Sequence, residues 1–218
     1  MSDASLSIMP ILAIPLGIMP LPEMELLNPV ISALFNERMR KESAAQRSPL
    51  CYHGSDDLFD WPDEPVRQLA AAIFRGLYAV VYAVNDFTET QLRALKSESS
   101  AWFTVIEHDG GVPATNYPLT TWCAIYCVEA PGPSPTRSDS GVLRFYESRP
   151  NTMFTDASNA AMRLPFTPGH HAWRPTPGNL AIFPASLTHE IAPVRSPGQL
   201  VLVTVRVRFV GPAQGLAR

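Results

Sequence analysis

The sequence predicts an α+β domain whose strands form a β-sandwich or a jelly roll. Helical periodicity is confined to the first hundred residues, and short runs of β-branched and aromatic residues separated by Gly and Pro follow it. The chain holds 22 prolines in 218 residues, which suits short strands and fixed loops better than long helices. We therefore expect one domain over residues 1–218, with a helical support region at 1–100 and a jelly-roll core at 101–210.

Composition and charge restrict the classes of function. The formal net charge is -3, whereas a protein held to nucleic acid by phosphate contacts is normally basic. Cys51, Cys123 and Cys127 form no CxxC pair, a pattern typical of a reducing cytoplasm. Residues 1–22 are apolar but lack a basic start and are interrupted by prolines, unlike a signal peptide or a membrane span. We expect a cytoplasmic protein with a small-molecule partner and neither nucleic acid nor membrane; a homodimer is left open.

Two helices are predicted in the first hundred residues. Asn28 precedes a proline, as at the start of a helix, and apolar residues at helical spacing follow. A second helix begins near Pro65 and keeps a 3.6-residue apolar period for five turns, to Val84. Its apolar stripe requires a sheet on which to pack.

Five strands are predicted after residue 100, at 101–107, 120–128, 142–146, 180–183 and 200–210. The last of them alternates well, with valines on one face and Arg206 on the other. The long loop at 149–177 is typical of a lid or rim, and its His170-His171 pair is expected at that rim.

Several segments, in order and spacing, resemble the bacterial and phage family of 2-oxoglutarate/Fe(II) oxygenases. Residues 175–189 fit the pattern P-x-x-G-x-L-x-x-F-P-x-x-L-x-H, and residues 141–149 are similar to G-x-L-x-F-x-D-P-R. Residues 122–128 resemble the strand W-S-G-V-Y-Y-V, while 26–28 and 52–61 resemble two upstream elements of the family. The resemblance covers nearly the whole chain and implies a double-stranded β-helix.

That resemblance also implies an iron site, against which this chain can be compared. The family holds iron with two ligands on one strand and a distal His, leaving positions open for 2-oxoglutarate and oxygen. His189 matches the distal ligand, but the family's H-x-H-P falls on Thr115, Asn116, Tyr117 and Pro118. The arginine that pairs with 2-oxoglutarate falls on Leu200. We therefore expect neither metal nor cofactor, with Fe(II) and 2-oxoglutarate as the alternative.

The candidate site residues follow from this alignment and from the strand pattern. We expect His189 and Tyr117 to be catalytic, and a second set to bind substrate: Arg206, Tyr126, Thr115 and Asn116. Three of them have a plainer interpretation: His189 as a buried inert histidine, Tyr117 as an aromatic that fills the metal volume, and Arg206 as a solvent-facing strand arginine.

Another pair, His108 and Asp109, could substitute as metal ligands. Adjacent residues of an extended chain point to opposite faces, however, and the Asp-Gly-Gly run that starts at Asp109 is typical of a turn.

Three functions remain open at this point. The first is a small-molecule tailoring enzyme of biosynthesis that has lost the iron triad and uses acid/base chemistry such as cyclisation, isomerisation or elimination. The second is an Fe(II)-dependent oxygenase with an atypical ligand set around His189. The third is a non-catalytic binding or partner subunit on the same fold.

Overall fold

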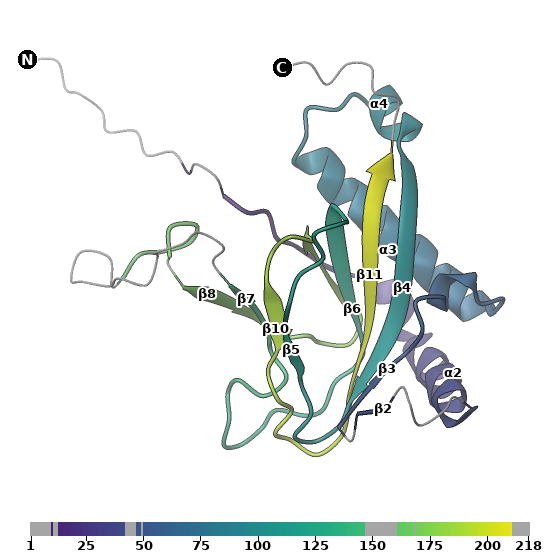
Figure 1. Ribbon diagram of the computed structural model, residues 1–218, viewed down its shortest axis with the longest axis vertical. Helices are drawn as coiled ribbons and strands as arrows, with labels where there is room; N and C mark the ends of the chain where they lie inside the picture. Colours follow the sequence, from purple (N-terminus) through teal and green to yellow (C-terminus); the bar gives the residue numbers. More distant parts are fainter. Residues whose placement is uncertain are drawn as a thin grey trace, which may run out of the picture.

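Two antiparallel sheets face each other, and helices cover the outer face of the larger one (Figure 1). The computed structural model describes residues 10, 13–41, 47–48, 50–146, 161–167 and 169–210, with the backbone alone at 47–48. The major sheet has the strand order β1-β9-β6-β11-β4-β3-β2, and the minor sheet has the order β5-β10-β7-β8. The space between the two sheets is called the interior below.

The strands are β1 (Gly17–Pro20), β2 (Arg47–Ser48), β3 (Cys51–His53), β4 (Lys96–Ile106), β5 (Val112–Thr115), β6 (Trp122–Glu129), β7 (Leu143–Tyr146), β8 (His170–Trp173), β9 (Asn179–Pro184), β10 (His189–Ile191) and β11 (Leu200–Val210). The helices are α1 (Pro22–Glu25), α2 (Asn28–Lys41), α3 (Glu64–Ala83), α4 (Glu89–Ala94) and the 3-10 helix η2 (Leu58–Asp60). This order confirms the α+β class.

The alternation predicted for the last strand is present in β11, which lies at the centre of the major sheet. It pairs with β4 along its whole length and with β6 on the other side. Val203 and Val205 face the helices, whereas Leu202 faces the interior. Because side chains alternate along a strand, Thr204 and Arg206 also face the interior.

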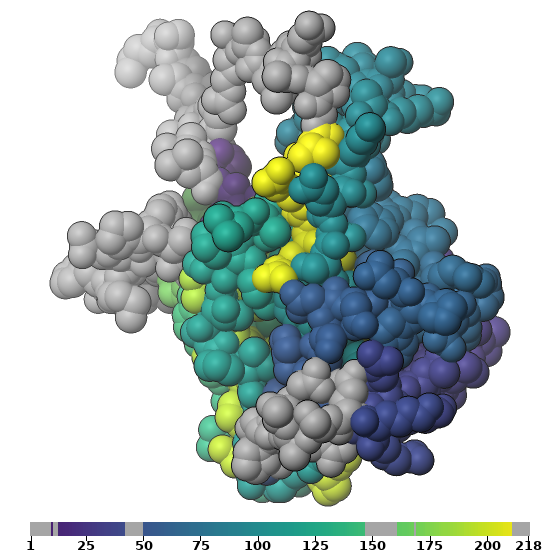
Figure 2. Space-filling view, turned by 45° about the vertical axis from the view of Figure 1, so that its right-hand side comes forward, coloured from purple at the N-terminus to yellow at the C-terminus, as the bar shows by residue number. Residues whose placement is uncertain are grey.

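The helices pack on the major sheet as the apolar stripe predicts. Buried residues of α3 recur at helical spacing, and the ring of Phe35 in α2 stacks on Phe103 of β4 with centroids 4.2 Å apart. At Gly76 of α3 a Cβ atom would lie 2.8 Å from the sulfur of Met19, so a glycine lets the helix approach the sheet closely. This helical region, purple to blue, covers one side of the molecule (Figure 2).

The division into a helical region at 1–100 and a jelly-roll core at 101–210 is wrong in detail. β1, β2 and β3 come from the first hundred residues, and β4 begins at Lys96. β8 lies within the predicted loop at 149–177, whose residues 149–160 and 168 lie outside the described residues, as do 147–149 of the motif at 141–149. None of the helices in the described ranges is long and apolar enough to cross a membrane.

Candidate functional site

Four side chains form a row across the inner face of the minor sheet. His189 of β10 is paired with Thr115 of β5 on one side and with Phe145 of β7 on the other, and Phe145 is paired with His171 of β8. Directly paired residues of an antiparallel sheet project from the same face. Since Phe145 belongs to the core between the sheets, the whole row faces the interior.

His189 is held as a neutral imidazole with a fixed proton. Its side chain is buried, and Nδ1 lies 2.9 Å from the carbonyl oxygen of Leu187. A carbonyl can only accept a hydrogen bond, so Nδ1 carries the proton and Nε2 keeps a lone pair. Burial lowers the pKa of His189, and the bond to Leu187 opposes that effect only in part. The ring is therefore suited to act as a base at neutral pH.

Tyr117 follows β5 and lies against His189, with ring centroids 5.6 Å apart. Its backbone N–H donates to the carbonyl of Ala185, 2.7 Å away, which fixes the chain beyond β5. Burial is the main cause that raises the pKa of Tyr117 above its ordinary value, and the charge of Arg206 opposes that rise. The phenol therefore keeps its proton and can donate a hydrogen bond.

Arg206 joins this cluster from the major sheet. Its guanidinium lies 5.0 Å from the ring centroid of Trp102 and 5.4 Å from that of Tyr117. Nη2 donates to Asp56 at 2.6 Å, and both Nε and Nη2 donate to Ser100. No hydrogen bond within the described residues uses Nη1. Arg206 thus projects from the interior face of β11, and its side chain stays partly exposed.

An aromatic line connects His189 to the opposite side of the interior. The His189 ring contacts the Phe183 ring with centroids 4.9 Å apart, and the Phe183 ring contacts the Phe145 ring with centroids 4.8 Å apart. His189 therefore lies between the Tyr117–Arg206 cluster and a pair of phenylalanines.

The structure separates the other expected substrate contacts. Thr115 lies in the inner row beside His189, whereas Asn116 is exposed and bonds the carbonyl of Ser186. Tyr126 belongs to the core between the major sheet and the helices, where its hydroxyl donates to Asn28 at 2.8 Å. The expectation that Tyr126 binds substrate in the interior is wrong, because β6 turns that residue toward α2.

His108 and Asp109 lie at the far end of β10 from His189. The backbone N–H of Asp109 donates to Val194, beyond the end of β10, and its carboxylate pairs with Arg195. Asp109 has a φ of 67°, as expected for the predicted turn. The pair is not brought to His189, so the suggestion of substitute ligands there is wrong.

The residues at the family positions do not fit an iron centre. His189 offers one imidazole, but Thr115 and Tyr117 offer only protonated hydroxyls, which bind iron(II) poorly. Leu200, at the expected arginine position, is buried and apolar. Within the described ranges, no group of three His, Cys, Asp or Glu side chains could hold a metal ion.

A cavity of about 700 Å³ opens beside this row, between the edge strand β1 of the major sheet and the edge strand β8 of the minor sheet. Phe145 and Leu187 line it, but His189 and Tyr117 do not. Its wall also includes His171, which the sequence places only in a long loop; a two-histidine run carries no signal for a strand. The complete lining is Pro10, Ala13, Ile14, Leu16, Ile18, Phe145, Tyr146, Met162, Leu164, Pro165, Phe166, Thr167, Gly169, His170, His171 and Leu187.

Comparison with known proteins identifies the fold. No protein-family model matches the chain, and no curated protein matches it by sequence. A Pseudomonas putida prolyl-4-hydroxylase is similar in structure at 15% identity and a TM-score of 0.60, over 90% of this chain and 93% of that one.

Two structures from nogalamycin biosynthesis are also similar. They are the non-heme alpha ketoglutarate dependent carbocyclase SnoK (12% identity, TM-score 0.58, 88% of this chain and 78% of that one) and the epimerase SnoN (10% identity, TM-score 0.56, 93% and 82%). Identities this low establish the fold alone. The chain therefore has the double-stranded β-helix fold of the 2-oxoglutarate/Fe(II) oxygenases.

Proposed function

We propose that this protein is a tailoring enzyme that acts on a small molecule by proton transfer, without iron and 2-oxoglutarate. The observation that carries the proposal is the contact between a neutral imidazole, His189, and a protonated phenol, Tyr117, with ring centroids 5.6 Å apart. A base and an acid held side by side in a buried site are what general acid–base catalysis requires.

The residues have separate roles in such a reaction. Nε2 of His189 accepts a proton from a C–H or O–H group of the substrate, and the hydroxyl of Tyr117 donates a hydrogen bond to the atom on which negative charge develops. Arg206 lies over the Tyr117 ring and lowers the cost of negative charge there or on the substrate. Proton transfer leaves the substrate's oxidation level unchanged, so cyclisation by addition, isomerisation and elimination are the reactions that fit.

The structural neighbours support a tailoring role but not the cofactor. Two of them are named as a carbocyclase and an epimerase from nogalamycin biosynthesis, so proteins of this fold include tailoring enzymes. Both are described as dependent on alpha ketoglutarate. That dependence is not carried over to this chain, because Thr115 and Tyr117 stand where iron ligands would be needed.

Turnover in heavy water tests the proposal. A panel of biosynthetic intermediates is incubated with the protein in D₂O with a strong chelator, and products are analysed by mass spectrometry and NMR. We expect a redox-neutral product, with solvent deuterium at the protonated carbon when the reaction is a cyclisation or an isomerisation. His189→Gln should lower turnover by roughly 10²–10⁴-fold, and Tyr117→Phe should lower it less.

The matched control is His108→Gln, an exposed histidine away from the site, which should keep full turnover. Turnover that needs added Fe(II) and consumes 2-oxoglutarate would replace the proposal with an oxygenase that has an atypical ligand set around His189.

One observation favours a second candidate, a non-catalytic binding subunit. The cavity beside the row is lined without His189 and Tyr117. A ligand that raises the melting temperature, stays chemically unchanged, and binds equally well to His189→Gln and Tyr117→Phe would favour this candidate.

A further inference from the structure

Exposed apolar side chains gather around the cavity between β1 and β8. Among the described residues, eleven large hydrophobic side chains are exposed, and five of these line the cavity: Ile14, Ile18, Met162, Leu164 and Phe166. Scattered exposed apolar residues need no explanation, but a group around one concave site is typical of a ligand pocket.

The two walls belong to edge strands that do not pair with each other. A Cβ atom at Gly17 of β1 would meet Val80 of α3, so Gly17 faces the helices and its neighbours Leu16 and Ile18 face the interior. On the opposite wall, Phe145 and His171 belong to the inner row of the minor sheet. The cavity therefore opens into the same interior as the row that contains His189.

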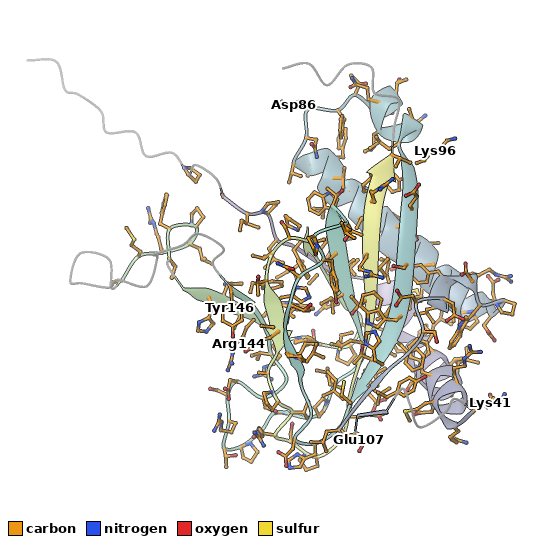
Figure 3. All side chains as sticks on the ribbon, in the orientation of Figure 1. Lys41, Asp86, Lys96, Glu107, Arg144 and Tyr146 are labelled. Carbon is orange, nitrogen blue, oxygen red and sulfur yellow. The ribbon has the colours of Figure 1, made fainter. Side chains whose placement is uncertain are left out.

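The polar side chains of the lining are concentrated near the end of β7 and the start of β8. Tyr146 is committed elsewhere, since its hydroxyl bonds Glu190. Arg144 and Tyr146 lie on the side of β7 away from the major sheet (Figure 3). His171, by contrast, projects inward beside Phe145. No Asp, Glu, Lys or Arg is among the described residues of the lining.

We propose that this cavity binds the substrate, and that the substrate is an uncharged, mainly apolar molecule with an oxygen function that hydrogen-bonds His171. This inference rests on the proposed function, since it names the class of substrate. A volume of about 700 Å³ lies in the range of drug-sized ligands. A carboxylate would lose hydration in the cavity without gaining a Lys or Arg partner from the described residues of the lining, which disfavours an anionic ligand.

Phe145 connects this cavity to the proton-transfer site. It lines the cavity, is paired with His189, and packs edge-on against Phe183, which in turn contacts His189. Phe145 therefore contacts both the cavity and the strand that carries His189.

Fluorescence titration with three probes of one shape tests this assignment. Pyrene supplies an apolar body, 1-hydroxypyrene adds a neutral hydroxyl, and 1-pyrenecarboxylate adds an anion. At pH 7 we expect 1-hydroxypyrene to bind tightest and 1-pyrenecarboxylate weakest. Leu164→Asp should weaken pyrene binding by about tenfold or more, because it places a charge against the apolar body. The matched control is Leu119→Asp, an exposed leucine that does not line the cavity.

The role of His171 is tested in the same titration. His171→Leu should weaken the binding of 1-hydroxypyrene by about 3–10-fold and leave the binding of pyrene unchanged, as expected for the loss of one hydrogen bond. The control is His108→Leu. Equal losses in Leu164→Asp and Leu119→Asp, or tightest binding of 1-pyrenecarboxylate, would overturn the inference, as would a His171→Leu protein with wild-type preference.

Binding and turnover are separated by His189→Gln, which should bind all three probes as the wild type does. Probe binding in the expected order without proton-transfer activity would disprove the proposed function alone. Proton-transfer activity without this binding pattern would disprove the cavity assignment alone.

Discussion

The Tyr117 ring lies between His189 and Arg206, with its centroid 5.6 Å from that of the His189 ring and 5.4 Å from the Arg206 guanidinium. His189 belongs to the minor sheet and Arg206 to the major sheet, so Tyr117 bridges the two sheets. Tyr117 therefore contacts both His189, a base that burial keeps neutral, and Arg206, a cation that forms an ion pair with Asp56.

The protonation of His189 should appear in the pH dependence of stability. Its pKa is lowered by burial, so the unfolded chain binds a proton more readily than the folded protein. The free energy of unfolding should therefore fall as the pH drops through the ordinary histidine pKa of about 6.5 and level off below the folded pKa. Urea unfolding between pH 8 and pH 4.5 measures this.

Two variants separate His189 from another histidine with a lowered pKa. Burial also lowers the pKa of His53. His189→Gln and His53→Gln should therefore each reduce the slope of the unfolding free energy against pH. A His189→Gln protein with the full wild-type slope would show that the pKa of His189 is not lowered in the folded protein.

Thiol reactivity tests the burial of the interior. Cys123 and Cys127 are fully buried, and burial raises the pKa of Cys127 to about 12 and that of Cys123 further still. A thiol reagent that attacks only the thiolate should leave both unmodified in the folded protein.

Cys51 supplies the internal comparison. It is partly exposed, and burial raises its pKa less, so it should react first. Reaction followed by mass spectrometry identifies the site. Rapid modification of Cys123 in the folded protein would mean that the interior at Arg206 is open to solvent.

The contacts of Arg206 should contribute measurably to stability. Arg206→Met removes the contacts of the guanidinium with Trp102 and Tyr117 and leaves Asp56 without its partner. We expect a loss of about 1–2 kcal/mol in the free energy of unfolding. The matched control is Arg208→Met on the same strand, whose exposed pair with Glu98 should contribute less than about 1 kcal/mol. Equal effects of the two substitutions in urea unfolding would contradict the interior placement of Arg206.

Long periodic segments were predictable from sequence. The strand expected at 200–210 coincides with β11, and the helix expected from Pro65 coincides with α3 to within a residue. Both carry their periodicity over many residues, so the pattern alone specifies the element.

Of the four strands in the minor sheet, only β7 was predicted. β5, β8 and β10 have only three or four residues each, and their pairing partners are distant in the sequence. A pattern this short carries little signal, because pairing with neighbouring strands determines the structure.

The site shows the same division between local and long-range information. Family resemblance located His189 and Tyr117, whose contact depends on the register that pairs His189 with Thr115. Tyr126 was misplaced because β6 is apolar on both faces, so alternation could not tell which face meets the helices.

Anaerobic calorimetric titration with Fe(II), with and without 2-oxoglutarate, tests most directly that this fold works here without an iron centre. The positive control is the double variant Thr115→His with Tyr117→Asp, which would place two histidines and a carboxylate at the family positions, since Thr115 is paired with His189. We expect stoichiometric iron binding by the double variant and none by the wild type. Micromolar or tighter stoichiometric binding to the wild type that is lost in His189→Gln would contradict the account.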